Sequence, residues 1–223
     1  LVVITTVVVT YVTTFAVARG LKLSRGVATL TATGFSICGA SAIAAVSPVA
    51  DAEERETALA VALVTIYGTV AIVLLPVLQA PLGLSDQQFG IWVGASVHEV
   101  AQVAATAAAT GAVALSIAMV VKLTRVLMLA PLLTLLSLRS RSHARSAGLR
   151  VTLVPGFVAG FIAMLLIRSS GFVPVAALDV SAILCTVMLG CGLFALGAGV
   201  VVRSLLVAGG RSLALGLIST IVA

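Results

Sequence analysis

Apolar stretches long enough to cross a lipid bilayer recur along the whole chain. An α-helix needs about 20 mainly apolar residues to cross about 30 Å of hydrocarbon. Eight such segments can be placed, at about residues 1–18, 27–49, 57–78, 89–110, 111–137, 152–168, 175–200 and 212–223. The segments are uniform runs of Val, Leu, Ala and Ile. The pattern therefore predicts an all-α polytopic membrane protein, built as a helical bundle.

Composition supports the same fold class. Hydrophobic residues make up 61% of the 223 and charged residues 9%, and the mean hydropathy is +1.27. A soluble domain is roughly half apolar and one quarter charged, so a water-soluble fold is excluded. The net charge of +6 does not indicate nucleic-acid binding, because the basic residues concentrate in loops between apolar spans.

The distribution of basic residues predicts an orientation. If every segment crosses once, nine of the 13 basic residues fall on one side: Arg19, Lys22, Arg25, Arg139, Arg141, Arg145, Arg150, Arg203 and Arg211. The opposite loops hold only Arg168 and Arg55, which lies within the acidic run 51–56. The positive-inside rule then places the nine in the cytoplasm and predicts a multi-pass protein of the bacterial inner membrane.

Both ends of the chain lie within apolar runs, and the first residue is not Met. We therefore expect residues 1–223 to form a single transmembrane domain that lacks its amino-terminal spans. The three cysteines, Cys38, Cys185 and Cys191, all fall inside apolar spans and do not indicate a disulfide framework. Membrane lipid is the expected environment, and the chain is compatible with a homo-oligomer.

Two segments rich in small residues, 27–49 and 89–110, resemble each other. Residues 34–46 align with residues 94–106 and share Gly, Ser and Ala positions. If every segment crosses once, the two run in the same direction, so an inverted repeat requires that one is re-entrant or that a span is misplaced. Glycines could break each helix and expose half-helix ends to a substrate, as in many transporters, although small residues also serve close helix packing. The candidate breaks are Gly34, Gly39 and Gly94.

His98, Glu99 and Gln102 form a polar cluster at the centre of an apolar span. A carboxylate in hydrocarbon must be paired, protonated or in contact with water, so such residues usually mark a functional site. A structural pair between Glu99 and a lysine is the competing interpretation. The motif HEVAQ (98–102) differs from the zinc motif H-E-x-x-H, because Gln102 replaces the second His. We therefore predict no metal, cofactor or catalytic residue.

Lys122 and Arg125 lie three residues apart within another span and therefore share one helix face. Two buried cations need negative partners. If Glu99 neutralises one, the other is available to hold an anion, unless Asp179 completes the neutralisation. This surplus of positive charge favours a small anion as substrate. One alternative is a cation/proton antiporter that uses Glu99 and Asp179, and a weaker one is an intramembrane enzyme.

Three motifs give the chain a family resemblance. The runs GFSICGASAIAAVSPV (34–49), FGIWVGASVHEVAQV (89–103) and VKLTRVLMLAP (121–131) together resemble the YeiH-like family of sulfate exporters. The likeness extends over the carboxyl-terminal two thirds of the family's usual chain. Family members are in turn similar to sodium/proton antiporters and bile-acid symporters, which implies an inverted-repeat transporter fold with discontinuous crossing helices.

The resemblance also implies a site and a function. One broken helix would contribute Ser36, Cys38, Gly39 and Ser41, and the other would contribute Ser96, His98, Glu99 and Gln102. Lys122 and Arg125 match the family's K-x-x-R pattern and would hold the anion. We expect a secondary transporter, not an enzyme, that exports sulfate or a related small oxyanion. Glu99 and His98 are the candidates for proton coupling.

Overall fold

The computed structural model describes residues 2–139, 156–171, 173–198 and 202–223, and within these ranges all regular structure is α-helical. The all-α prediction is confirmed. The helices, in chain order, are α1 (Val2–Gly20), α2 (Arg25–Ser36), α3 (Ala40–Val46), α4 (Glu54–Gln79), α5 (Asp86–Ser96), α6 (Val100–Ala108), α7 (Ala112–Leu127), α8 (Leu129–Arg139), α10 (Gly156–Ser169), α11 (Val175–Ala198) and α12 (Val202–Val222).

Among the described residues, three helical stretches are long and apolar enough to cross a membrane. They are α1, α4 and the combined α7 and α8, over Val2–Gly20, Glu54–Gln79 and Ala112–Leu136. The two segments richest in small residues instead break into four half-helices of 12, 7, 11 and 9 residues, namely α2, α3, α5 and α6. At 1.5 Å per residue, none of these four crosses a bilayer alone.

The first broken segment is a re-entrant hairpin. Helix α2 starts at the N-cap Ser24, and the chain leaves it at Ile37 and turns through Gly39, which has a φ of 68°. The start of α4 then lies beside the start of α2, because the Ser24 hydroxyl donates to the Glu56 carboxylate. Further along, Gly34 of α2 faces Val64 of α4. Since α2 and α4 run in parallel, α3 must return the chain toward the end of the bundle from which α2 entered.

The second broken segment repeats this arrangement from the other end. Along α5, Gly90 faces Ala114 and Gly94 faces Ala118, so α5 runs parallel to α7 and α6 returns the chain. Helix α5 begins where the 26-residue α4 ends, and Gln79 donates to Asp86 there over 3.0 Å. The two hairpins therefore enter from opposite ends of the bundle.

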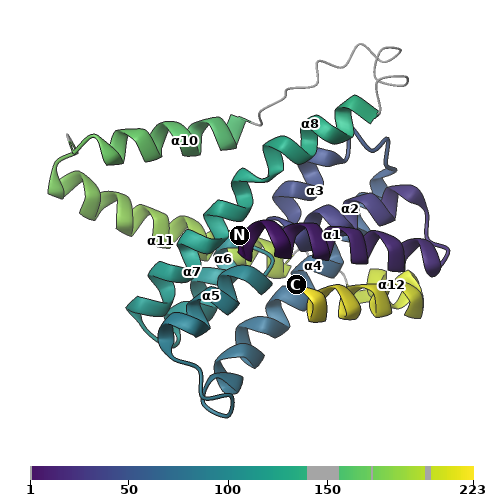
Figure 1. The fold of residues 1–223 in the computed structure, drawn as a ribbon, viewed down its shortest axis with the longest axis horizontal. Coiled ribbons are helices and arrows are strands. Elements are labelled where there is room, and N and C mark those ends of the chain that lie inside the picture. The colour runs from purple at the N-terminus through teal and green to yellow at the C-terminus, as the bar shows by residue number, and fades with distance from the viewer. Residues whose placement is uncertain (1, 140–155, 172, 199–201) are drawn as a thin grey trace.

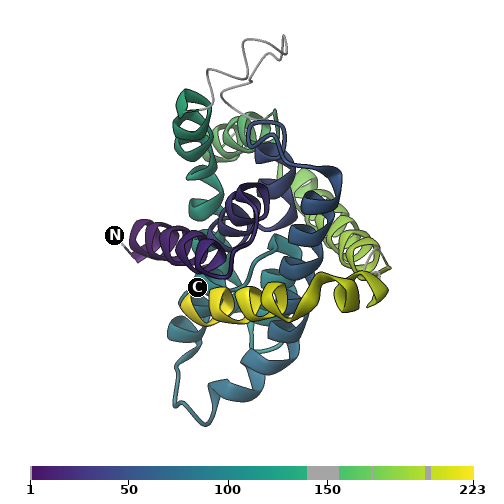
Figure 2. The same cartoon turned by 90° about the vertical axis from the view of Figure 1, so that its right-hand side faces the viewer.

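The last three helices lie at the periphery of this core. Figure 1 shows α10 and α11 as an arm at the edge of the bundle. Helix α12 is kinked at Gly209 (φ 74°), and Figures 1 and 2 show its later part beside α1. Thr14 of α1 donates to Ser219 over 3.0 Å, and Tyr67 of α4 donates to the Leu213 carbonyl over 2.6 Å. Helix α12 thus ties α1 to α4.

Two sequence predictions need correction. The acidic run 51–56 does not lie opposite the loop of Arg19 and Arg25, because Glu56 accepts a hydrogen bond from Ser24 in that loop. Gly34 and Gly94 are not the breaks, because both lie within helices. The breaks fall at 37–39 and 97–99, so only Gly39 was placed correctly. Arg141, Arg145 and Arg150, and the start of the predicted span 152–168, lie outside the described residues.

Candidate functional site

The tips of the two hairpins meet on α7, around the side chain of Lys122. This lysine is completely buried. Its ammonium group donates to the carbonyl oxygens of Ile37 and Val97, each over 2.8 Å. Each acceptor is the first residue after a half-helix, since α2 ends at Ser36 and α5 at Ser96. One cation therefore joins the two breaks.

Arg125, one turn further along α7, binds the same two helix ends and is also completely buried. Its Nε and Nη2 atoms donate to α2, to the carbonyls of Ser36 over 3.1 Å and Phe35 over 2.8 Å. Its Nη1 atom donates to α5, to the carbonyls of Gly94 over 3.4 Å and Ala95. The guanidinium group thereby fixes the two half-helices side by side.

The physical reason for this arrangement is the helix terminus. The last carbonyl groups of an α-helix lack partners within the helix, and the peptide dipoles give that end a partial negative charge. Two such ends buried in a membrane protein cannot be satisfied by bulk water. Lys122 and Arg125 supply both hydrogen bonds and positive charge. The negative partners expected beside these cations are thus six backbone carbonyl groups.

Glu99 lies at helix N-termini, where N–H groups lack partners within the helix. Its carboxylate accepts a hydrogen bond from the N–H of Ala40, the first residue of α3, and Glu99 is itself the N-cap of α6. The side chain is 7% exposed. An anionic group is favoured at the partially positive start of a helix. Both pairs of half-helix ends are therefore neutralised by charged side chains of the protein itself.

Gln102 holds the second break in place. Its side-chain oxygen accepts from the N–H of Glu99 over 3.2 Å, and its amide donates to the Thr65 carbonyl of α4 over 3.1 Å. Gln102 thus orients the backbone that carries Glu99 and connects α6 to α4.

His98 is completely buried next to these groups. Its ring lies against Phe35 of α2, with ring centroids 4.3 Å apart. The Nε2 atom lies 3.4 Å from the Thr220 hydroxyl of α12. The Nδ1 atom has no hydrogen-bond partner among the described residues. A buried imidazole with an unused nitrogen can take up a proton or bind a guest molecule.

The side chains of the other predicted site residues do not bond to Lys122, Arg125 or Glu99 in the described part of the chain. The Ser36 hydroxyl donates to Thr33 and that of Ser96 donates to Trp92, each within its own helix. The Cys38 thiol is buried at the first break, whereas Ser41 is exposed on α3. Lys122, Arg125, Glu99, His98 and Gln102 are brought together, and Ser36 joins them through its backbone carbonyl.

Sequence reasoning missed the residues that come from other helices. Thr65 of α4, Phe35 of α2 and Thr220 of α12 all contact the polar cluster. Thr220 follows Ser219 within an apolar run, and polar pairs of this kind often face helix interfaces in membranes. That signal could have marked the end of the chain as an interior element.

A family model described as conserved hypothetical protein 698 matches residues 1–216. Curated relatives include a UPF0324 membrane protein of Corynebacterium glutamicum, 42% identical over 86% of this chain and 56% of the relative. Another, from Bacillus cereus, is 33% identical over 98% of this chain and 66% of the relative. The chain thus spans less than two thirds of the length of these relatives. No solved structure matches.

Proposed function

This chain belongs to the family described as conserved hypothetical protein 698, whose curated relatives are membrane proteins, and from this premise we propose that it is the core of a secondary transporter. The proposed cargo is sulfate or a related small oxyanion, exported across the bacterial inner membrane. The observation that carries the proposal is the meeting of two re-entrant hairpins around buried Lys122, Arg125 and Glu99.

Discontinuous helices that meet inside a membrane protein support transport. Irregular backbone at membrane depth is tolerated where it is buried in protein or lines a cavity. Buried ionisable residues in such a position are costly and typically belong to an ion or substrate path. Transporter sites commonly lie where two repeat-related elements with broken helices meet.

The balance of charge favours an anion. In formal charge, Lys122 and Arg125 bring two positive charges to the cluster and Glu99 brings one negative charge, in addition to the partly negative ends of α2 and α5. Asp179, the other acid considered for this site, is exposed on α11. The ammonium group has three N–H bonds and the guanidinium group five. The hydrogen bonds described above use two and four of them, so one N–H of each remains for an oxyanion.

Glu99 is the proposed coupling residue, with His98 as a second candidate. Its carboxylate occupies the start of α3, so neutralising it by protonation would remove the anionic partner of the Ala40 N–H. An incoming anion and the charged carboxylate would compete for the same positive region. Proton uptake by Glu99 and anion binding would then be linked.

Sulfate flux in proteoliposomes that contain the full-length protein tests both parts of the proposal. We expect uptake above that of empty liposomes, with a rate that changes with pH. Glu99→Gln should retain sulfate binding and lose the pH response, because an amide cannot exchange the coupling proton. Glu54→Gln is the matched control, since Glu54 is exposed at the start of α4.

Two outcomes would contradict the proposal. An unchanged pH response in Glu99→Gln would remove Glu99 from the coupling role. Absence of flux for sulfate, sulfite, sulfonates, halides and carboxylates, together with sodium- or potassium-driven proton movement, would favour the cation/proton antiporter instead.

A further inference from the structure

A cleft away from the hairpin tips is lined by residues of α1, α2 and α8. It has a volume of about 660 Å³ and is lined mainly by apolar side chains, including Val12, Phe15 and Leu136. Val12 is 59% exposed, so the cleft opens on the outer surface of α1. That surface is apolar, with exposed Val2, Ile4, Val8 and Val9. In a membrane protein such a surface faces lipid or another helix.

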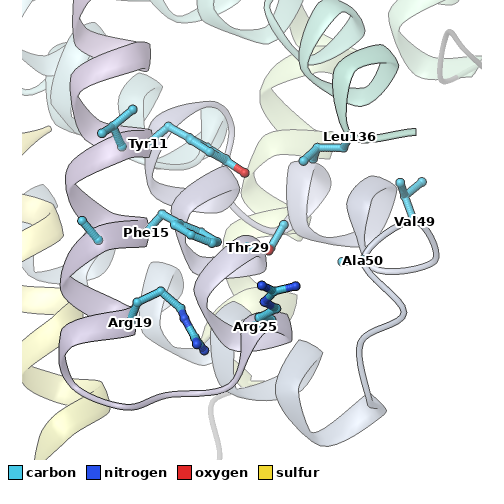
Figure 3. A pocket seen from close by; sticks show the side chains of 10 residues that line it. Tyr11, Phe15, Arg19, Arg25, Thr29, Val49, Ala50 and Leu136 are labelled. Carbon is cyan, nitrogen blue, oxygen red and sulfur yellow. The ribbon is translucent and has the colours of Figure 1, made fainter. Parts of the chain in front are cut away.

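Two arginines lie at one end of this cleft. Arg19 lies in the last turn of α1, and Arg25 is the first residue of α2. Both side chains are exposed. Figure 3 shows them at the same end, with Tyr11 at the other. Arg19 donates to the Leu23 carbonyl over 3.0 Å, and Arg25 has no hydrogen-bond partner among the described residues. The pair offers unused charge-assisted donors, which suit a phosphate group.

An aromatic wall continues from the arginines toward the middle of α1. Tyr11, Phe15 and Arg19 are spaced four residues apart and therefore lie on one helix face. The rings of Tyr11 and Phe15 stack, with centroids 6.4 Å apart and an interplanar angle of 8°. The eight residues from Arg19 back to Tyr11 correspond to about 12 Å of helix. The cleft thus has a basic end at the α1–α2 turn and an apolar wall that leads away from it.

We propose that this cleft binds one anionic phospholipid. The phosphate lies between Arg19 and Arg25, and an acyl chain lies along Phe15 and Tyr11 toward Leu136. Charge complementarity selects the head group, because basic pockets between transmembrane helices near the membrane surface bind anionic lipid head groups. This site is separate from the hairpin tips, and the inference does not depend on the transported substrate.

Native mass spectrometry of the full-length protein, titrated with phosphatidylglycerol or phosphatidylcholine in detergent, tests the proposal. We expect phosphatidylglycerol to bind more tightly. R19Q/R25Q should lower its affinity about 30-fold, since each basic residue near an anionic head group contributes about 1 kcal/mol and tenfold corresponds to 1.4 kcal/mol. K22Q/R55Q is the matched control, because Lys22 and Arg55 are exposed, lie outside the cleft and carry the same charge.

A second variant tests the apolar wall without changing charge. Ala16 lines the cleft and is exposed, so Ala16→Trp should fill the opening and weaken phosphatidylglycerol binding. Equal affinity of both double variants, or equal affinity for the two lipids, would overturn the proposal. Binding of glycerol phosphate as tight as that of phosphatidylglycerol would show a site for soluble phosphate. A wild-type protein that binds neither lipid would also overturn the proposal.

Discussion

At the scale of single residues, the buried charges are paired with helix ends rather than with each other. Lys122 and Arg125 bind carbonyl groups at the ends of α2 and α5, and Glu99 binds the first N–H of α3. Each charge therefore has a definite partner, which offsets the cost of removing it from water. This pairing depends on backbone geometry, and Gly39 at the first break adopts a φ of 68° that allows it.

Gly39→Ala tests that dependence. A Cβ atom at Gly39, where φ is 68°, would meet the Glu99 carboxylate, whereas Gly83 has a φ of 63° and open space around it. Positive φ alone costs an alanine about 1–2 kcal/mol. We expect Gly39→Ala to lower the free energy of unfolding by about 1–3 kcal/mol more than Gly83→Ala, because of the overlap. Thermal unfolding in detergent measures this, and equal losses at the two glycines would disprove the steric role of Glu99.

At the scale of elements, the protein uses two kinds of helix. Long apolar helices such as α1 and α4 are long enough to cross a membrane, whereas the half-helices α2, α3, α5 and α6 are too short and form two hairpins that fold back. Because α4 separates the two hairpins, they enter from opposite sides. This opposite orientation is what an inverted repeat requires, and the prediction of single crossings did not provide it.

Thiol labelling distinguishes the two topologies. Single cysteines replace the exposed residues Gly20, Glu54 and Gln87 in a protein without its three native cysteines. The structure places Gly20 and Glu54 at one end of the bundle and Gln87 at the other, whereas eight single crossings would put Gly20 with Gln87. With a membrane-impermeant reagent on intact cells, we expect Gln87→Cys alone to react. Labelling of Glu54→Cys but not Gln87→Cys would restore the single-crossing topology.

At the scale of the whole molecule, α12 contributes to the polar cluster. After its kink at Gly209, helix α12 brings Thr220 to His98, 122 residues away in sequence. The same helix bonds to α1 and α4 through Ser219 and Leu213. The polar cluster therefore contacts helices from the first, middle and last parts of the described chain.

Thr220→Val tests the contact between α12 and His98. The Thr220 hydroxyl donates to Gly216 in its own helix and faces His98, whereas the Thr186 hydroxyl donates only to Ala182 and is exposed. Loss of a partner by a buried polar group costs about 1–3 kcal/mol. We expect Thr220→Val to lower the free energy of unfolding by about that amount in a detergent melt and Thr186→Val to change it by less than about 0.5 kcal/mol. Indistinguishable melts would mean that α12 does not hold His98.

The sequence located much of the site because burial in a membrane makes polar residues conspicuous. His98, Glu99, Lys122 and Arg125 were identified as mid-span groups, and the structure brings them together at the hairpin tips. Their partners were not predictable, because a backbone carbonyl carries no signature in the sequence. Thr220 and Phe35 were missed for a related reason, since each joins the cluster only through packing of separate helices.

By itself, the sequence determined that the described chain is helical and suited to a membrane, and it marked the two segments in which a helix could break, since hydrophobicity and small-residue content are local properties. Only the tertiary structure decided that both broken segments fold back and that the acidic run 51–56 lies at the same end of the bundle as Arg19 and Arg25. It also decided that Lys122 and Arg125 bind the carbonyl groups at the ends of α2 and α5. These features depend on which helices lie side by side, and contacts between residues far apart in sequence decide that.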